Sequence, residues 1–436
     1  MISAKYLIIG NSIAAINAIE GIREMDRKGS IILISDEPSH VYSRPLISYY
    51  LAERIHEDSM SYRTLSFYDD HQVRTYLGRR AVGLNASDKR VILDDQTEIG
   101  FEKLLLATGG VPFIPEIQGS SLQGVFTFTT LEDAKNLKEF IKLHKVRRAV
   151  VLGGGLIGLK AAEALISLKI QTIIIELADR LLSATFDQTA SMIIEHALNH
   201  IGCAIMKQNT VKAFIEGKDG RIGSVLLEDD SRILCDLVII AIGVQPRIDF
   251  VQGTGIEINK GILVDDSLQT SVKSIYAAGD VVECYDYIIN KNRPMAILPN
   301  ASRQGRIAGH NMAGGKREYK GSLAMNSIEI AHIPTVSVGL TDPTLITDPE
   351  RQKRIEVLQY VREKENIYQK IIIEGNRIIG VILIGKIDRA GIYTGLIKDK
   401  TDISSVKDHL LKEDFGLLSL PKAYRKHLVT GQGIEV

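Results

Sequence analysis

Short apolar runs that break at a glycine recur along the chain, and each is followed by a segment with helical spacing. The run from Lys5 to Ile9 breaks at Gly10 and continues as an amphipathic pattern from Ile16 to Met25. A second β-rich run, Ile31 to Ile34, comes next. This order predicts a βαβ unit with small residues at the three positions of a G-x-G-x-x-G fingerprint, Gly10, Ser12 and Ala15. Taken alone, this degenerate copy is as typical of a structural turn as of a ligand site.

A second copy of the pattern is complete. A strand is predicted over Ala149 to Leu152, an alanine-rich helix over Leu159 to Ser167, and a further strand over Thr172 to Ile175 that ends on Glu176. Between the first strand and the helix stands a full fingerprint, Gly153, Gly154, Gly155, Leu156, Ile157 and Gly158. Glycines at these positions let a pyrophosphate approach the backbone, and the helix N-terminus offers unpaired N–H groups to it. The second copy therefore predicts a dinucleotide site.

Each half of the chain also ends in the same pattern, a predicted strand followed by a glycine turn. Phe101 to Leu106 is a predicted strand that leads to Ala107, Thr108 and Gly109, and Leu237 to Ile242 leads to Gly243. A third strand, Ser274 to Ala278, leads to Gly279 and Asp280, before a helix predicted over Asn300 to Met312. Because the second domain has already closed at Leu237 to Ile242, the third turn must return to the first domain. We expect the second nucleotide-binding domain to be inserted in the first.

Composition narrows the possible partners. The 436 residues carry 53 Lys+Arg and 53 Asp+Glu, so the basic excess of a nucleic-acid binder is missing. No stretch is long and apolar enough for a membrane span, and no cleavable signal pattern opens the chain, so a cytoplasmic location is expected. The 3 cysteines, Cys203, Cys235 and Cys284, have no metal-ligand or disulfide-framework spacing. Any redox centre would have to be a bound cofactor.

The five ordered motifs resemble the two-dinucleotide-binding flavoproteins, the FAD-containing pyridine nucleotide oxidoreductases. Within that family, Asp36-Glu37-Pro38 followed by Tyr42 to Ser48 is similar to rubredoxin reductases, oxygenase-coupled ferredoxin reductases and apoptosis-inducing factor. The resemblance implies an α/β fold of two Rossmann-like domains of the glutathione-reductase type, with FAD on the first fingerprint and NAD(P)H on the inserted second. It implies further that Asp36 and Glu37 meet the adenosine ribose of FAD, that Arg44 meets its pyrophosphate or the surroundings of that group, and that Asp280 meets its ribityl chain. The other residues implied to line the two nucleotides are Gly10, Ser12, Ile13, Ala14, Ala15, Val82, Ala107, Thr108, Gly109, Gly279, Leu298 and Pro299 for FAD, and Gly153, Gly155, Leu156, Ile157, Gly158, Glu176 and Gly243 for NAD(P)H.

Two departures from the family pattern carry information. No cysteine stands in the segment Tyr42 to Ser48, where disulfide-reductase relatives keep a redox thiol, so thiol-based chemistry is disfavoured. Many relatives have Glu directly after the second fingerprint, whereas this chain has Lys160, with Glu163 one turn later. The contacts of the nicotinamide therefore stay open. No catalytic residue is assigned, because the cofactors carry the hydride chemistry themselves.

The last part of the chain predicts a separate α+β domain. Predicted strands are Ile328 to Ala331, Thr335 to Val338, Ile355 to Tyr360, Tyr368 to Ile373 and Arg377 to Ile384, with helices at Arg389 to Lys398 and Ser404 to Leu411. The resemblance gives this domain a role in shielding the flavin and in acceptor or dimer contacts. The expected division is 1–118 and 249–320 for the FAD domain, 119–248 for the NAD(P) domain and 321–436 for the C-terminal domain.

The expected activity is hydride transfer from NADH to FAD, followed by electron transfer to a rubredoxin or ferredoxin. Glu176 favours NADH because a carboxylate there repels a 2′-phosphate, while Arg180 keeps NADPH open. Alternatives are an NADH oxidase or diaphorase with a small-molecule acceptor, a flavoprotein subunit of a larger anaerobic oxidoreductase, and a redox-sensing interaction protein that is not an enzyme. A homodimer is also compatible with the sequence.

Two further groups of side chains have simpler interpretations. His196 and His200 lie one helical turn apart with Cys203 close behind, but histidines are common near helix C-termini, so no metal site is assigned. Basic residues gather in two places where an acidic carrier protein could be steered, although a solvated surface is the more ordinary interpretation. These are Lys316, Arg317 and Lys320, and then Lys422, Arg425, Lys426 and His427.

Overall fold

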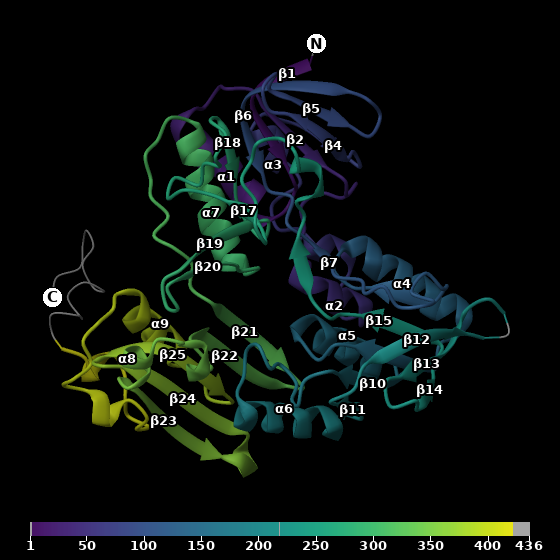
Figure 1. Ribbon diagram of the computed structural model, residues 1–436, viewed down its shortest axis with the longest axis vertical. Coiled ribbons are helices and arrows are strands. Elements are labelled where there is room, and N and C mark those ends of the chain that lie inside the picture. Colours follow the sequence, from purple (N-terminus) through teal and green to yellow (C-terminus); the bar gives the residue numbers. More distant parts are fainter. Residues whose placement is uncertain (1, 218, 422–436) are drawn as a thin grey trace. The chain divides into compact units, whose positions relative to one another are not determined.

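The computed structural model describes residues 2–217 and 219–421, which form two compact units (Figure 1). One unit contains the described residues up to Leu177 together with Gly202 to Ser322, and the other contains Ala178 to Ile201 together with the described residues from Leu323 onward. Segment 178–201, which the sequence assigned to the NAD(P) domain, groups with the C-terminal part of the chain. The four-part domain division remains a prediction.

The first fingerprint opens a sheet of strand order β3-β2-β1-β6-β5-β4, with β18 also paired to β6. Its strands β3, β2, β1, β6 and β18 run parallel, and β4 to β6 form an antiparallel meander. The strands are β1 (Ile2–Ile9), β2 (Ile31–Ser35), β3 (Val73–Leu77), β4 (Ala81–Asn85), β5 (Arg90–Leu93), β6 (Glu98–Leu106) and β18 (Ile275–Ala277). The β2 strand is buried along its whole length because parallel sheets of this kind are covered on both faces.

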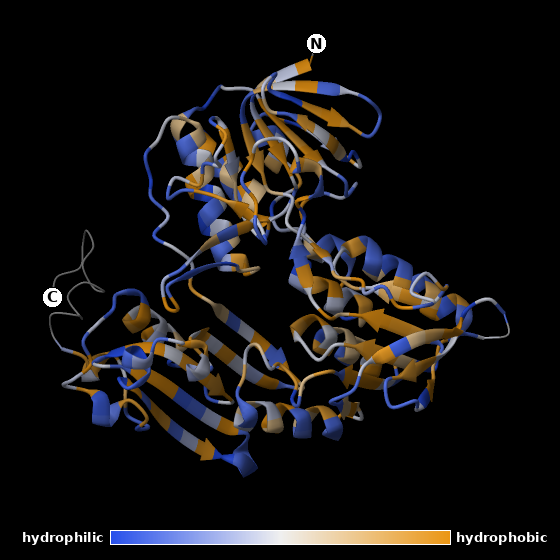
Figure 2. Cartoon of the chain, viewed as in Figure 1, coloured by the Kyte–Doolittle hydropathy of each residue, from blue (hydrophilic) through white to orange (hydrophobic). Residues whose placement is uncertain are grey.

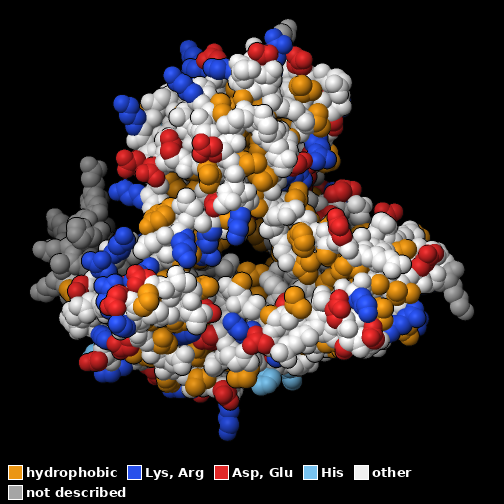
Figure 3. All heavy atoms as spheres, in the orientation of Figure 1, with side chains coloured by type: hydrophobic (Ala, Val, Ile, Leu, Met, Phe, Trp, Pro, Cys, Tyr) orange, Lys and Arg blue, Asp and Glu red, His pale blue; other side chains and the backbone are white. Residues whose placement is uncertain are grey.

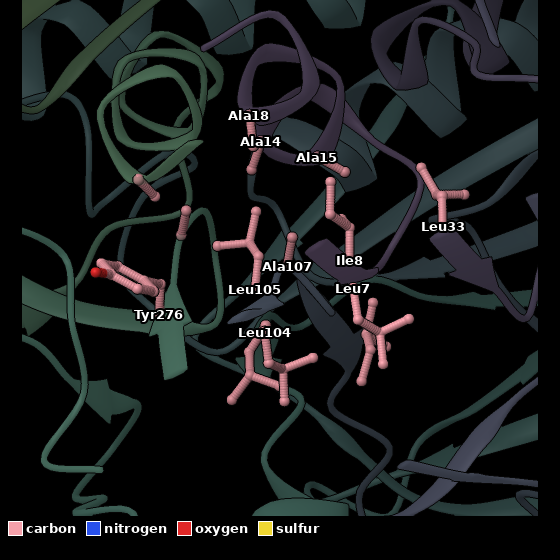
Figure 4. Close-up of a cluster of buried hydrophobic side chains, with 14 of the residues drawn as sticks. Leu7, Ile8, Ala14, Ala15, Ala18, Leu33, Leu104, Leu105, Ala107 and Tyr276 are labelled. Atoms are coloured by element: carbon pink, nitrogen blue, oxygen red, sulfur yellow. The ribbon is translucent and has the colours of Figure 1, made fainter. Parts of the chain in front are cut away.

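Helices α1 (Ile13–Met25) and α7 (Leu298–Met312) pack on this sheet and lie side by side (Figure 1). Figure 4 shows the small alanines of α1 turned towards the strand side chains of Ile8 and Leu105. The two helices approach closely because α7 has glycines at the crossing. A Cβ at Gly305 would lie 2.0 Å from the Ala14 carbonyl oxygen, and one at Gly309 would lie 2.0 Å from that of Ala18.

The second fingerprint opens a parallel sheet of order β11-β10-β9-β15-β8. Its strands are β8 (Val125–Thr127), β9 (Arg148–Leu152), β10 (Gln171–Glu176), β11 (Ala204–Lys207) and β15 (Leu237–Ile240). Helix α5 (Leu156–Ser167) packs on β9 and β10, and α4 (Leu131–His144) contacts β8. The two strand–turn–helix units predicted from the glycine pattern are thus present, the first in a mixed sheet and the second in a parallel one.

A two-stranded sheet joins these two halves. Strand β7 (Gly110–Pro112) pairs antiparallel with β16 (Val244–Pro246). The segment by which the chain leaves the first half therefore lies beside the segment by which it returns. The remaining strands of this unit are β12 (Val211–Glu216), β13 (Ile222–Leu227), β14 (Arg232–Leu234), β17 (Ile262–Leu263), β19 (Val282–Asp286) and β20 (Lys291–Pro294). The short helices are α2 (Ile47–Leu51), α3 (Phe67–Asp70), η1 (Arg44–Leu46), η2 (Glu57–Met60) and η3 (Asp249–Val251).

The other unit is built on an antiparallel sheet of order β21-β22-β25-β24-β23. Its strands alternate apolar and polar stretches (Figure 2). Its elements are β21 (Met325–Ile330), β22 (Ile333–Gly339), β23 (Ile355–Arg362), β24 (Ile367–Glu374), β25 (Arg377–Ile384), α6 (Gln188–His200), α8 (Pro349–Gln352), α9 (Ala390–Lys398), η4 (Pro343–Leu345), η5 (Glu363–Glu365), η6 (Lys407–His409) and η7 (Leu417–Ser419). The five predicted strands are confirmed, and Gly375 with Asn376 forms the tight turn of the β24–β25 hairpin. The helix predicted over Ser404 to Leu411 is wrong, because only the single turn η6 forms there.

Candidate functional site

The turn after β1 needs a glycine at its first position. Gly10 has φ +118°, and a Cβ there would lie 2.0 Å from the Ala107 carbonyl oxygen. Helix α1 then begins with Ile13, Ala14 and Ala15, all buried, behind the N-cap residue Ser12. Ser12 makes no side-chain capping hydrogen bond, and the first turn contains no acidic residue. The unsatisfied N–H groups and the positive end of the helix dipole therefore suit an anionic ligand.

Helix α5, which follows the second glycine turn, has the same open start. It begins behind Gly155, without a side-chain cap or an acidic first turn. Helix α7, which follows β20, also begins without either feature. By contrast, α4 carries a complete capping box from Thr130 and Asp133. The two helices that begin at a fingerprint, α1 and α5, thus have uncapped N-termini, whereas α4 in the same unit is capped by its own side chains. This pattern fits phosphate binding by backbone groups.

The third turn lies against the first. Gly279 has φ +87°, and a Cβ there would lie 3.1 Å from the Ala14 Cβ, while its N–H donates to Gln304 Oε1 at 2.8 Å. Asp280 follows this turn. Burial raises the pKa of its carboxyl, and the charge of Arg44 acts in the opposite direction. The structure therefore brings Gly10, Ala14, Gly279 and Asp280 to one end of the β1 sheet.

Opposite charges gather beside these turns. Glu37 forms an ion pair with Arg44 and accepts a hydrogen bond from the Tyr42 hydroxyl at 2.6 Å. Arg44 also donates to the Thr129 carbonyl oxygen at 3.0 Å. Burial lowers the pKa of Arg44, but Tyr42, Glu37, Asp280 and Asp36 raise it above its ordinary value. The Arg44 side chain is nevertheless 41% exposed, so its guanidinium stays accessible to a ligand. An accessible cation beside carboxylates suits the polar middle of a dinucleotide.

Asp36, at the end of β2, forms an ion pair with Arg247, a residue that sequence reasoning missed. The Arg247 backbone is held by the turn after β6, where its N–H donates to the Gly109 carbonyl oxygen at 3.0 Å and its own carbonyl accepts from Thr108 Oγ1 at 3.1 Å. Nothing in the sequence signals this pair, because the two partners are 211 residues apart.

Three further residues predicted to line FAD are exposed, and their contact with FAD stays a prediction. They are Val82 on β4 and Leu298 and Pro299 at the start of α7.

At the second fingerprint some glycines are required because a Cβ would collide with neighbouring backbone, whereas others face free space. A Cβ at Gly153 would lie 2.4 Å from the Ala241 carbonyl oxygen, and one at Gly158 would lie 2.0 Å from that of Gly153, so both are required by packing. At Gly155 and at Gly243 no atom lies within 4 Å of the Cβ position in the part of the chain described, which leaves the backbone open to a ligand. Leu156 and Ile157 open α5 directly behind Gly155. Glu176 Oε2 accepts from the Gly154 N–H at 2.6 Å, so the predicted ribose-binding carboxylate does reach the glycine turn.

Lys160 and Glu163 on α5 form an ion pair at 2.7 Å. Lys160 Nζ also lies 5.3 Å from the centre of the Tyr49 ring on α2.

The three cysteines are buried, and burial raises the pKa of each thiol to about 12. A thiol with that pKa is almost entirely protonated near neutral pH, and the thiol is not the nucleophilic form. The chain thus offers buried, protonated cysteines rather than a reactive thiolate.

The remaining candidates do not form a site in the structure. His196 and His200 are exposed on α6 whereas Cys203 is buried, and across residues 2–217 and 219–421 no group of three or more His, Cys, Asp or Glu is placed to hold a metal ion. Arg317 is engaged with Glu24 at 2.8 Å. Basic and acidic side chains are interspersed on the face seen in Figure 3. The second basic cluster, from Lys422 to His427, lies outside the described residues. No helix in the described residues is long and apolar enough to cross a membrane.

Comparison with known proteins places this geometry in a family. Residues 4–305 match the pyridine nucleotide-disulphide oxidoreductase family. The chain belongs to this family. Residues 326–401 match a second model, the rubredoxin NAD+ reductase C-terminal domain. The family is FAD-dependent and uses NADH, so the resemblance stated from the motifs is confirmed, as are the enzyme class and the FAD and NADH cofactors.

Individual relatives agree with the family match. The chain is 32% identical over 411 residues to the NADH-dependent phenylglyoxylate dehydrogenase subunit epsilon of Aromatoleum evansii, covering 93% of this chain and 94% of that protein. It is 31% identical over 309 residues to the rubredoxin-NAD(+) reductase of Pseudomonas putida, covering 71% and 80%. Against the nitrite reductase of Bacillus subtilis it spans 48% of that protein's length. Among solved structures, the covalent putidaredoxin reductase–putidaredoxin complex matches with TM-score 0.81 and 24% identity, covering 92% of this chain and 94% of that chain. The fold is thus that of the flavoprotein reductases with two dinucleotide-binding domains and a C-terminal domain, as predicted.

Proposed function

We propose that this protein transfers hydride from NADH to bound FAD and passes the electrons to a small rubredoxin-type or iron–sulfur carrier protein. The observation that carries the proposal is the match of residues 326–401 to the rubredoxin NAD+ reductase C-terminal domain on a chain that has no thiol in its Tyr42 to Ser48 segment. Bound FAD supplies the two-electron acceptor for hydride and the donor for one-electron transfer. What the protein supplies is binding, orientation and charge.

The first fingerprint is the proposed FAD site. The open N-terminus of α1, behind the turn at Gly10, would bind the pyrophosphate through backbone N–H groups. Arg44 would neutralise the same group, and Glu37 holds Arg44 in place by their ion pair. Asp280, beside the Gly279 turn, would accept a hydrogen bond from a cofactor hydroxyl. Ala107, Thr108 and Gly109 would line the cofactor from the end of β6.

The second fingerprint is the proposed NADH site. Gly155 leaves its backbone open, and the Glu176 carboxylate, held by the Gly154 N–H, would accept the adenosine ribose hydroxyls. A negative charge at this position repels a 2′-phosphate. Arg180 could balance that charge, but its guanidinium already donates to Asp179 at 2.9 Å and to the Phe186 carbonyl oxygen at 3.3 Å. These contacts support NADH over NADPH.

The carrier is proposed because the electrons have no thiol to pass through. In a disulfide reductase a protein thiol next to the flavin receives the electrons, and here the three cysteines are buried with raised pKa values. The acceptor must then react with the flavin directly. A relative named a rubredoxin-NAD(+) reductase shares 31% identity over 309 residues, which supports a rubredoxin-type acceptor.

A second candidate is a flavoprotein subunit of a larger oxidoreductase. The relative from Aromatoleum evansii is named as a subunit, and the match covers 93% of this chain and 94% of that protein. In that case the carrier would be a partner subunit rather than a diffusing protein. A cytoplasmic location and a homodimer also stay predictions.

The test is anaerobic stopped-flow spectroscopy on the FAD-loaded protein. The flavin is first reduced with one equivalent of NADH and is then mixed separately with oxidised rubredoxin, oxidised ferredoxin, oxygen and a quinone. The proposal expects one of the two iron proteins to reoxidise the flavin at least about tenfold faster than oxygen or quinone does at equal concentration. Faster reoxidation by oxygen would instead identify an NADH oxidase, and failure of every acceptor would favour the subunit of a larger complex.

A further inference from the structure

Arg247 lies where the chain re-enters the first nucleotide half. It directly follows β16, whose pairing with β7 aligns Pro246 with Gly110. Its backbone is hydrogen bonded at two points to the turn after β6, through Gly109 and Thr108. That turn adjoins the first fingerprint, because the Ala107 N–H donates to the Ile9 carbonyl oxygen at 2.8 Å. Arg247 is therefore fixed at the carboxyl end of the β1 sheet, the edge at which open α/β sheets bind their ligands.

The side chain of Arg247 reaches across this edge to Asp36, which follows β2, and forms an ion pair with it. Both partners keep some access to solvent, 27% for the Arg247 side chain and 39% for that of Asp36. The Nε atom of Arg247, however, is buried and has no hydrogen-bond partner among the residues that the structure describes. A guanidinium has five N–H donors in one plane, so the exposed part of the Arg247 side chain, rather than the buried Nε, is where a ligand acceptor could bind beside the ion pair with Asp36.

The charges around Arg247 indicate what that acceptor is. The carboxylates of Asp36, Glu37 and Asp280 all lie close enough to Arg44 to raise its pKa. The pyrophosphate of FAD in the proposed site would add further negative charge. Arg44 compensates Glu37, and Arg247 compensates Asp36. Guanidinium groups bind phosphate oxygens by paired, charge-assisted hydrogen bonds, which a lysine cannot reproduce.

We propose that Arg247 is a further FAD-binding residue, which neutralises Asp36 and donates to an oxygen of the adenosine diphosphate half of the cofactor. The inference rests on the proposed FAD site. The inference also has a consequence for the fold. Because Arg247 belongs to the segment that returns from the inserted half, bound FAD would stabilise the position of that segment through Arg247 and its contacts with Thr108 and Gly109.

The test measures FAD binding in the absence of NADH and of any acceptor. Apoprotein of the full chain is titrated with FAD, and the dissociation constant is read from quenching of FAD fluorescence, for wild type, Arg247→Met, Arg247→Lys and Arg80→Met. Arg80 is the matched control, since it also forms an ion pair with an aspartate far along the chain, Asp249 at 3.4 Å, but both side chains of that pair are exposed. Loss of a charge-assisted hydrogen bond predicts at least about tenfold weaker FAD binding in Arg247→Met and a smaller loss in Arg247→Lys. Arg80→Met should bind as wild type.

Two results would overturn the inference. Unchanged FAD affinity in Arg247→Met would show that Arg247 only supports the connection, and tighter binding would show that it competes with the cofactor for Asp36. If Arg247→Met fails to fold, judged by circular dichroism of the apoprotein, Arg247→Lys decides by the same affinity measurement, with affinity equal to wild type counting against the inference. Neither NADH nor a carrier is present in this titration. The FAD affinities therefore stay valid if the proposed electron transfer fails, and a failure of the Arg247 inference leaves the proposed electron transfer untouched.

Discussion

Replacing Gly305 by Ala should loosen the crossing of α1 and α7 and with it the FAD site. An added Cβ would lie 2.0 Å from the Ala14 carbonyl oxygen and 2.7 Å from its carbonyl carbon, where non-bonded carbon atoms prefer about 3.5–4.0 Å. Because both groups in conflict belong to helix backbones, no side-chain rotation relieves the clash. The helices must move apart, and Ala14 lies in the first turn of α1, directly behind the open end that would bind the pyrophosphate.

The magnitude follows from two opposing effects. Alanine is favoured over glycine inside a helix by about 1 kcal/mol, while overpacking a filled contact costs about 1–3 kcal/mol. We expect the overpacking to dominate, since the conflict is with backbone, and the net loss to reach about 1–2 kcal/mol. For a folding unit of this size, each kcal/mol lowers Tm by about 2–4 °C. The Tm of FAD release should therefore fall by several degrees.

The assay is a thermal ramp that follows the rise of FAD fluorescence on release, with circular dichroism recorded in parallel. The matched control is Gly391→Ala in α9, where no described atom lies within 4 Å of the added Cβ. There the same substitution should be neutral or stabilise by about 0.4–1 kcal/mol. If Gly305→Ala releases FAD at the wild-type temperature, the two helices do not cross as closely as the structure has them.

Three further substitutions or treatments test separate parts of the molecule. Lys370 is buried on β24 and donates a hydrogen bond to Asp187, the N-cap of α6, at 2.8 Å. Lys370→Met should therefore lower the unfolding free energy of its unit by about 3–5 kcal/mol, measured by hydrogen exchange of the β24 amides. An unchanged unfolding free energy would contradict burial of the charge pair. Removing the repulsive carboxylate in Glu176→Ala should raise the NADPH/NADH ratio of kcat/KM at least about tenfold, and an unchanged ratio would remove Glu176 from nucleotide selection. With thiol pKa values of about 12, only about 1 thiol in 10⁴ is ionised at pH 8, so iodoacetamide should leave NADH-dependent flavin reduction intact in the folded protein, and rapid inactivation would expose a reactive thiolate. The cysteines concerned are Cys203, Cys235 and Cys284.

The parts of the fold that could be predicted are those with a local signal. Glycine turns between β-rich runs and helical spacing located both fingerprints, because steric demands on Gly10 and Gly153 are visible in the residue type itself. Element boundaries moved by a few residues, as with α7, which begins at Leu298 rather than Asn300. The helical spacing of Ser404 to Leu411 was misleading, since a short apolar pattern does not by itself fix a helix.

Contacts between distant segments could not be predicted. Asp187 and Lys370 are separated by 183 residues, and the lysine stands in an ordinary strand pattern that gives no sign of its burial. This pair joins the N-terminus of α6 to β24, a contact that agrees with the grouping of segment 178–201 with the C-terminal residues. Arg247 and Asp36 are likewise a product of the fold, since the insertion carries Arg247 far along the chain from the turn to which it is bonded.

The central claim is that FAD is the only redox group between NADH and the acceptor. An anaerobic titration of the FAD-loaded protein with NADH, followed by flavin absorbance, tests it most directly. One equivalent of NADH per FAD should bleach the flavin completely, because no protein disulfide takes up a second pair of electrons. A requirement for two equivalents, with thiols appearing as the flavin is reduced, would contradict the account.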